Sequence, residues 1–238
     1  MLSHKLLDWY RANRRALPWR ETSDPYAVWV SEVMLQQTRV DTAKGYYARF
    51  MCAFPDVFAL AGAEESRVLN IWKGLGYYAR ARNMHRAAKV IAEAYGGRFP
   101  RDYGALKRLP GVGAYTAAAV MSIAYNEPFP AIDANALRVA ARLMALEDAG
   151  GGARKEKAAA LFSEMMRGQR AGDVAQAVME LGALVCTPHA PQCPACPLRE
   201  GCEAYKKGLQ NALPPRKKRC GALPEERYVA AAVLRGES

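Results

Sequence analysis

Four cysteines near the end of the chain place the tightest constraint on how it can fold. Cys186, Cys193, Cys196 and Cys202 form the pattern C-x6-C-x2-C-x5-C. Four thiolates match the ligand count of a 4Fe–4S cluster. Zinc also accepts four cysteines, usually as two close pairs, and the uneven spacing here fits that arrangement poorly. The intervening CPACPLREGC has little apolar bulk, so we expect a bound metal to supply its order.

The rest of the chain has the periodicity of helices. Apolar residues recur at helical spacing, and Gly, Pro or polar residues separate the segments. Asp24-Pro25 is a helix start signal, and no alternating strand pattern occurs before residue 227. The sequence therefore predicts an all-α fold. Besides a helix in the first residues, the expected helices are 26–37, 39–53, 64–73, 80–95, 113–125, 133–146, 155–167 and 173–185.

An excess of basic residues favours a polyanionic partner. The chain has 34 Lys and Arg against 23 Asp and Glu, a formal charge of +11. That surplus suits nucleic acid, although a merely solvated basic surface is the alternative. No apolar run approaches the roughly 20 residues that span a bilayer, and the first residues lack the apolar core of a signal peptide. We expect a cytoplasmic protein with reduced cysteines, in which Cys52 is a small core residue.

The composition changes after Cys202. Residues 206–219 read KKGLQNALPPRKKR and contain no acidic side chain. We interpret 206–226 as an exposed basic linker. Residues 227–238 then resemble a single strand, which is not stable without a partner. We expect this strand to be the first element of a further domain that is cut off or absent.

A glycine-containing turn at 109–120, LPGVGAYTAAAV, precedes an alanine-rich helix. Gly111 and Gly113 permit backbone conformations and close approaches that a Cβ would block. The N–H groups at the start of the following helix can bind a phosphate. A lone G-x-G turn is weak support, but Leu109-Pro110 before it and Tyr115-Thr116 after it strengthen the interpretation of a DNA-binding hairpin.

Glu32 is a carboxyl group on an otherwise apolar segment, VSEVMLQQT. If it is desolvated, its pKa rises and it suits general acid catalysis. By pattern alone, the commoner outcome is an exposed glutamate on the solvent face of a helix.

Asp133 lies at the start of a helix in FPAIDANALRV. Aspartate is a preferred N-cap, and most such residues only cap. The alternative is a carboxylate that faces a sugar made cationic by glycosidic cleavage, paired with a second carboxyl in another protonation state.

Together these motifs resemble the MutY adenine glycosylases. The resemblance runs over residues 8–205 and is carried by LPWR, SEVMLQQTRV, GLGYYARARNMHRAA, LPGVGAYTA and the cysteine pattern, in that order. It implies a helix-hairpin-helix glycosylase fold with a DNA cleft between two modules. Residues 20–125 would form a six-helix barrel with the hairpin, and residues 1–19 plus 126–205 the iron–sulfur module. It also implies a monomeric, nucleoid-associated bacterial enzyme that removes adenine opposite 8-oxoguanine or G in duplex DNA.

The resemblance assigns catalytic roles to four residues. Glu32 matches the acid that protonates the departing adenine, and Asp133 the carboxylate that stabilises the sugar. Asn135 matches an assisting asparagine. Tyr115 stands where endonuclease III-like enzymes carry a lysine, and a phenol cannot form a Schiff base. The resemblance therefore implies a monofunctional glycosylase that leaves an abasic site.

The same comparison assigns residues to the DNA-contacting surface. The adenine pocket would be lined by Arg15, Trp19, Arg20, Leu35 and Glu180. Gln37 and Thr38 would face the oxidised guanine, and Tyr77 would be a wedge beside it that helps to evert the adenine. Gly111 and Gly113 would contact the DNA backbone, and the 4Fe–4S cluster would be structural.

Two departures keep alternatives open. The chain reads DANA at 133–136 where the family usually reads DGNV, and Ala134 could disfavour a glycine-like backbone angle or narrow the approach to the sugar. Most of a C-terminal MutT-like domain is missing, so discrimination for 8-oxoguanine over guanine is expected to be weaker. The rival functions are a thymine-mismatch glycosylase, an oxidised-pyrimidine glycosylase and a non-catalytic iron–sulfur module that binds DNA.

Overall fold

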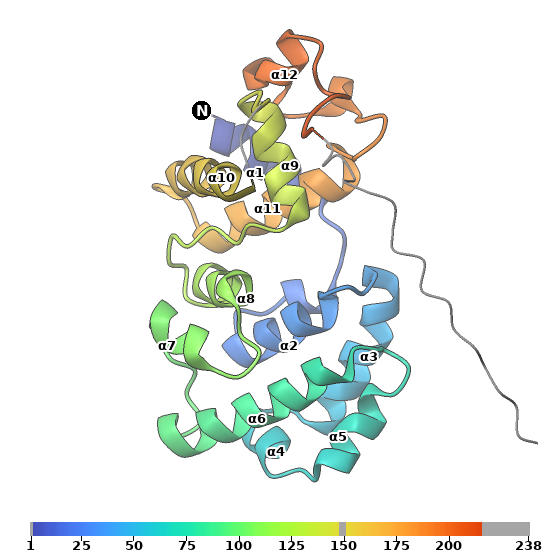
Figure 1. Ribbon diagram of the computed structural model, residues 1–238, viewed down its shortest axis with the longest axis vertical. Helices are drawn as coiled ribbons and strands as arrows, with labels where there is room; N and C mark the ends of the chain where they lie inside the picture. Colours follow the sequence, from blue (N-terminus) through green and yellow to red (C-terminus); the bar gives the residue numbers. More distant parts are fainter. Residues whose placement is uncertain (1, 148–150, 216–238) are drawn as a thin grey trace, which may run out of the picture.

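Every regular element in the described part of the chain is helical, as the sequence predicts. The computed structural model describes residues 2–147 and 151–215 (Figure 1). The helices are α1 Leu2–Asn13, α2 Pro25–Leu35, α3 Val40–Ala53, α4 Val57–Ala61, α5 Glu65–Trp72, α6 Tyr78–Tyr95, α7 Tyr103–Arg108, α8 Ala114–Ala119, α9 Ala134–Leu143, α10 Gly151–Met166, α11 Ala171–Leu184 and α12 Glu203–Lys206. Short helical turns lie at Pro18–Arg20, Val120–Ala124, Cys193–Ala195 and Arg199–Gly201.

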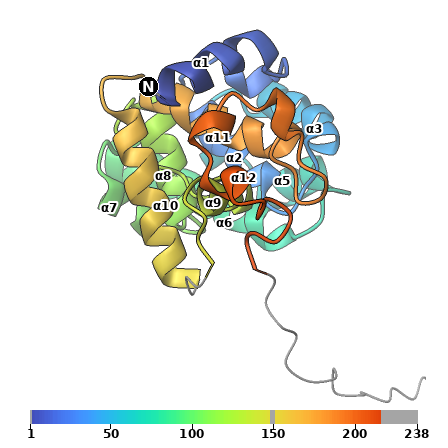
Figure 2. The same ribbon diagram turned by 90° about the horizontal axis from the view of Figure 1, so that it is seen from above.

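The helices form two groups, each around its own buried apolar cluster. One cluster gathers apolar residues between positions 17 and 131, from α2 to α8 and the π-helical turn Val120–Ala124. The other gathers residues of α1, α9, α10 and α11 together with Leu198. Figure 1 shows the second group stacked above the first, and Figure 2 shows α1 beside α11 when the molecule is seen from above. The chain therefore passes between the groups once after α1 and once before α9.

Helix α2 lies at the centre of the first cluster. Asp24 caps it by accepting hydrogen bonds from the N–H groups of Tyr26 and Ala27, at 3.3 and 3.1 Å. Pro25 follows in the first turn, where its missing N–H costs nothing. Residues 26–34 are all buried, so the helix has no solvent face. A helix apolar on every side is stable only inside a core.

Three short helices were not predicted, and several predicted helices end at other residues: those predicted at 26–37 and 133–146 end at Leu35 and Leu143. Helices α4, α7 and α12 span 5, 6 and 4 residues, too few for a 3.6-residue period to show. The helix predicted at 113–125 is α-helical only to Ala119 and continues as a π-helical turn. Cys52, expected in the core, is exposed on α3 because it faces away from the first cluster.

The prediction of an exposed linker at 206–226 is wrong near its beginning, where the chain packs against the protein. Residues 207–213 follow α12 in hydrogen-bonded turns, and the Leu213 side chain is buried. The Leu213 carbonyl accepts a 2.9 Å hydrogen bond from Arg142 Nε. This segment is therefore packed onto α9 instead of extending into solvent. The rest of the predicted linker beyond residue 215, and the predicted strand at 227–238, lie outside the described residues.

Gly172 of α11 packs directly against the π-helical turn of the other group. A Cβ there would lie 2.8 Å from both Ile123 Cα and the Ser122 carbonyl oxygen, which are backbone atoms that cannot rotate away. We expect Gly172→Ala to lower the free energy of unfolding by roughly 1–3 kcal/mol through overpacking, measured by chemical denaturation.

Gly152→Ala is the matched control for this change. Gly152 also lies within a helix, and an added Cβ would meet nothing within 4 Å. Alanine is the better helix former by about 0.5–1 kcal/mol, so this variant should be neutral or more stable. Equal denaturation midpoints for the two variants would mean that the packing at Gly172 is not tight.

Candidate active site

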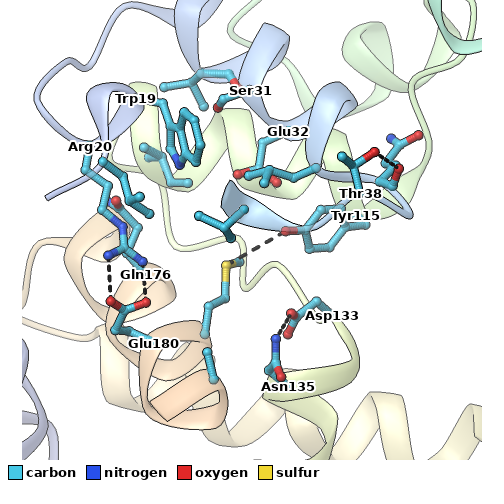
Figure 3. Close-up of a pocket in the computed structure, with 18 of the residues that line it drawn as sticks. Trp19, Arg20, Ser31, Glu32, Thr38, Tyr115, Asp133, Asn135, Gln176 and Glu180 are labelled. Atoms are coloured by element: carbon cyan, nitrogen blue, oxygen red, sulfur yellow. Dashed lines mark hydrogen bonds and ion pairs between the residues drawn. The ribbon is translucent and has the colours of Figure 1, made fainter. Parts of the chain in front are cut away.

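A cavity of about 470 Å³ opens where the two groups of helices meet. Figure 3 shows side chains from α2, α8, α9 and α11 pointing into it. Eleven of the residues singled out in the sequence line it, although they come from distant parts of the chain. They are Arg15, Trp19, Arg20, Glu32, Leu35, Gln37, Thr38, Tyr115, Asp133, Asn135 and Glu180.

Glu32 is buried on α2, with 6% of its surface exposed. Burial raises the pKa of its carboxyl group from 4.5 to about 7. The Tyr115 hydroxyl and Arg20 act in the opposite direction, whereas the charge of Asp133 raises the pKa further. The pattern-based expectation of an exposed glutamate is therefore wrong, because α2 is enclosed on every side. Near neutral pH, Glu32 holds a proton for part of the time.

Asp133 both caps α9 and lines the cavity, so its two interpretations are compatible. Its Oδ1 accepts from the Ala136 N–H at 2.6 Å, and its Oδ2 accepts from Asn135 Nδ2 at 2.8 Å. Burial raises the pKa of Asp133, and these hydrogen bonds offset only part of the rise. The two N–H donors favour the charged form of Asp133. Figure 3 shows it across the cavity from Glu32, below Tyr115.

Ala134, which replaces the family's glycine, sits in ordinary helical backbone. It is the first residue of α9, and it is not among the described residues with positive φ. No glycine-like angle is therefore required at this position. The Ala134 side chain is exposed on the cavity wall. Compared with glycine, its methyl group reduces the space that is open to a ligand.

Tyr115 lies between the two carboxyl groups. Its hydroxyl is 3.8 Å from Met179 Sδ, and burial together with the negative charge of Glu32 raises the pKa of the phenol well above 10. The side chain therefore remains a neutral phenol that can donate a hydrogen bond but cannot act as an amine nucleophile.

A buried ion cluster forms the opposite wall. Glu180 is completely buried and accepts hydrogen bonds from Arg15 and Arg20, the shortest at 2.6 and 2.7 Å. Burial alone would raise the pKa of Glu180, but the two guanidinium groups lower it to about 2. Beside this cluster, the Trp19 ring packs edge-on against Tyr47 at 5.3 Å. The wall therefore combines fixed positive charge with a flat aromatic surface.

Besides the four cysteines, three of the singled-out residues lie outside the cavity. Tyr77 is 63% exposed at the start of α6 and has a left-handed backbone, with φ of 48°. Gly111 has φ of 75°, and a Cβ there would lie 2.6 Å from the Asn83 Cβ, so the turn requires glycine. Gly113 caps α8, and an added Cβ would meet nothing within 4 Å. These positions lie on the surface around the cavity.

A buried arginine that the sequence analysis missed links this site to the cysteine segment. Arg138 donates to Asn135 Oδ1 at 2.8 Å and to the carbonyls of Gly182 and Cys186 at 2.7 and 2.8 Å. Asn135 in turn donates to Asp133. The i,i+3 spacing of Asn135 and Arg138 on a helix was the only signal that could have indicated the contact.

The four clustered cysteines are free thiols that line one small cavity of about 30 Å³. Burial and the neighbouring thiols raise the pKa of Cys193 and Cys202, and raise that of Cys196 to about 11. Thiols placed together in this way become thiolates only if positive charge lies among them. Arg142 supplies one donor, at 3.3 Å from Cys186 Sγ. The donor set therefore fits a metal centre.

Within residues 2–147 and 151–215, no group of three or more His, Cys, Asp or Glu side chains has the geometry of a preformed metal-ion site. In the same residues, no helix is long and apolar enough to cross a membrane.

Comparisons with known proteins agree with this geometry. Residues 30–167 match the model of the HhH-GPD superfamily base excision DNA repair proteins. The chain is 42% identical over 224 residues to the adenine DNA glycosylase of Mus musculus, covering 89% of this chain but 44% of that protein. It is 36% identical to the adenine DNA glycosylase of Buchnera aphidicola, covering 92% of this chain and 64% of that one. The chain thus spans about half the length of these curated relatives.

Solved structures give the same fold. A thermostable thymine-DNA glycosylase matches with a TM-score of 0.77 and 30% identity, over 86% of this chain and 95% of that one. An endonuclease III trapped covalently on DNA matches with a TM-score of 0.71 and 22% identity, over 87% and 95% of the two chains. The second likeness concerns the fold alone.

The raised pKa of Glu32 has a consequence for stability. A carboxyl whose pKa is about 7 when folded and 4.5 when unfolded binds more protons in the folded state, so its contribution to stability is lost as pH rises from 4.5 to 7. We expect Glu32→Gln, which cannot ionise, to be more stable than the parent above pH 7, by roughly 3 kcal/mol. Near pH 4.5 the two proteins should differ little.

Chemical denaturation at pH 5 and pH 8 measures this difference. Glu93→Gln, at an exposed position on α6, is the control and should track the parent at both pH values. A stability gain for Glu32→Gln that does not depend on pH would show that the carboxyl is not desolvated.

Proposed function

The chain belongs to the HhH-GPD superfamily of base excision DNA repair proteins, and on that premise we propose that it is a monofunctional adenine DNA glycosylase. It hydrolyses the N-glycosidic bond of adenine paired with 8-oxoguanine or guanine in duplex DNA and leaves an abasic site. The observation that carries the proposal is the meeting of a proton-holding Glu32 and a hydrogen-bonded Asp133 at one cavity.

Glu32 acts as the general acid. Adenine leaves deoxyribose poorly as an anion, and protonation of the purine ring makes the leaving group neutral. A carboxyl with a pKa of about 7 carries the proton at neutral pH and gives it up readily, which is the requirement for general acid catalysis. The raised pKa of the Tyr115 phenol keeps that group protonated, so it can hold the Glu32 carboxyl in place by a hydrogen bond.

Asp133 stabilises the sugar. As the glycosidic bond breaks, positive charge develops on the deoxyribose, and a fixed carboxylate lowers the energy of that state. The Asn135 amide and the Ala136 N–H hold the Asp133 oxygens, so little reorganisation is needed. Asp133 either remains an ion-pair partner or forms a transient bond to the sugar, which water then breaks to give the abasic site.

The adenine is held by the opposite wall. Every hydrogen bond found for the Glu180 oxygens comes from Arg15 or Arg20. We therefore assign Glu180 to fixing the two arginines and not to direct contact with the base. Trp19 and Leu35 supply apolar surface for a purine, and the cavity volume of about 470 Å³ accommodates a nucleoside.

Tyr115 accounts for the absence of strand cleavage in this proposal. Cleavage by β-elimination needs an amine that forms a Schiff base with the sugar, and a phenol cannot do so. The reaction therefore ends at the abasic site.

Cys186, Cys193, Cys196 and Cys202 would hold a 4Fe–4S cluster. Bound there, the cluster supplies the positive charge that keeps four thiolates together and orders the segment between them. Arg142 would support the segment by donating to Cys186 Sγ and to the carbonyls of Thr187 and Pro188. We assign the cluster a structural role.

Duplex DNA would lie across the surface around the cavity. Gly113, where an added Cβ would meet nothing within 4 Å, leaves room for a phosphate at the start of α8, and Gly111 permits the tight turn before it. Tyr77 is exposed and would act as the wedge, and Gln37 and Thr38, which line the cavity, would face the partner base. The protein would act as a monomer on chromosomal DNA in the cytoplasm.

One observation favours a second candidate, a thymine-mismatch glycosylase. The thermostable thymine-DNA glycosylase shares the fold over most of its length, with 30% identity. A buried, protonated Glu32 favours adenine, because a purine leaving group gains from protonation. The substrate test below distinguishes the two candidates.

Single-turnover assays on duplexes with A opposite 8-oxoguanine, A opposite G and T opposite G test the proposal. We expect release of adenine, with a rate that falls roughly 10²–10⁴-fold in Glu32→Gln because the general acid is lost. Borohydride should trap no covalent adduct. The exposed Glu93→Gln serves as the control and should keep the parent rate.

Release of thymine by the parent protein would favour the second candidate. An unchanged rate in Glu32→Gln would remove the acid from the mechanism, and a borohydride adduct would contradict the assignment of Tyr115.

Metal analysis tests the cofactor assignment. We expect four irons and four acid-labile sulfides per chain in protein purified without oxygen, and loss of both from a Cys196→Ser variant. The matched control is Cys52→Ser, at an exposed cysteine outside the pattern, which should keep the full iron content. One zinc per chain, without sulfide, would contradict the assignment.

A further inference from the structure

Arg80 joins two exposed turns on the DNA-facing surface without entering the cavity. It lies in the first turn of α6, and its guanidinium sits between the rings of Trp72 and Tyr77, at 5.4 and 5.3 Å from their centres. It is not among the residues that line the 470 Å³ cavity. Any effect of Arg80 on the reaction must therefore act through other residues.

One side of the guanidinium holds the end of α2. Nη1 donates to the carbonyls of Val33 and Met34 at 2.9 and 3.0 Å, and also to the carbonyl of Gln36. These carbonyls belong to the last turn of α2, where no intrahelical partner is available and the helix dipole is negative. Arg80 therefore fixes the point at which the catalytic helix ends and the Gln37–Thr38 turn begins.

The other side holds the turn that carries the wedge. Nη2 donates to the carbonyl of Gly76 and to Thr38 Oγ1, both at 3.3 Å. Gly76 directly precedes Tyr77, whose ring also packs on the guanidinium. The same group lines a small cavity with Pro110 and Gly111 of the hairpin. Three surface segments from separate parts of the chain thus converge on one side chain.

Both turns hold unfavourable backbone conformations. Gln37 and Tyr77 have φ of 59° and 48°, in the left-handed region, although neither is glycine. Such a conformation is unfavourable for a residue with a side chain and persists only where the surroundings over-determine it. Arg80 is the side chain that bonds to both turns, so it is placed to hold them in this form.

We infer that Arg80 is a positioning residue that locks Tyr77 and the Gln37–Thr38 turn into one rigid unit, so that the wedge enters the duplex in register with the cavity. This inference rests on the proposed function for the role of the wedge. Arginine is required because its planar fork reaches acceptors on both turns at once. A lysine keeps the charge but reaches only one side.

Arg80→Lys in the full chain tests the inference, with Arg82→Lys as the matched control. Arg82 lies on the same helix but is exposed and pairs with Glu65. We expect Arg80→Lys to lower the single-turnover rate on A opposite 8-oxoguanine at least 10-fold, with binding to undamaged duplex within 2-fold of the parent. It should also reduce the rise in fluorescence of 2-aminopurine placed beside the target base, which reports unstacking. Arg82→Lys should change neither measurement.

A double-mutant cycle separates positioning from a general loss of structure. In a Tyr77→Ala background the wedge is absent, so Arg80→Lys should lower the rate by less than 2-fold further. A full 10-fold loss in that background would overturn the inference, as would a parental rate and fluorescence in Arg80→Lys itself. If Arg80→Lys proves unstable, Thr38→Val removes one acceptor only. It should reduce the 2-aminopurine signal 2-fold or more without a change in melting temperature, and an unchanged signal would overturn the inference.

The fluorescence measurement does not require base release. If the parent protein released thymine or no base, the proposed function would fail, yet wedge insertion into the matching mismatch would still be measurable. A parental fluorescence rise in Arg80→Lys would then overturn the inference independently.

Discussion

The enclosure of one carboxyl group in an apolar helix is the constraint on which the rest of the structure depends. Helix α2 has no solvent face, and Glu32 is its only acidic or basic side chain. Burying an ionisable group is tolerated when the group can become neutral, and the pKa of about 7 shows that Glu32 does so readily. Glu32 lines the cavity between the two groups of helices, so its proton can be transferred to a molecule bound there.

A second buried carboxyl group, Glu180, lies on the other side of the same cavity, and its pKa is shifted in the opposite direction. Arg15 and Arg20 surround it and hold its pKa at about 2, so it stays charged. Glu180 and Glu32 are both deeply buried, and what lowers the pKa of Glu180 is the set of hydrogen bonds from Arg20 and Arg15 together with their charge. One wall of the cavity is thus permanently ionic, while the other can exchange a proton.

Sequence reasoning predicted the long helices and most of the side chains that meet at the cavity, because helical periodicity and motif order are local properties. It did not predict the burial of Glu32 correctly from pattern alone, since burial depends on helices far away in the chain. Tyr77, expected as a wedge on the DNA-contacting surface, is exposed outside the cavity, and its role stays a prediction. Arg80 and Arg138 were missed because most of their partners are backbone carbonyls, which leave no mark in a sequence.

The packing of the first helix against a helix near the end of the chain has a consequence during protein synthesis. Helix α1 packs against α11, and Arg15 bonds to Glu180 across 165 positions of sequence. At about 5–20 residues per second on the ribosome, α1 waits on the order of 10–30 s for this partner. Until then Leu6, Leu7 and Tyr10, which are buried in the second cluster of the folded protein, lack their α11 partner, so this apolar face of α1 is not fully covered while the chain is being made.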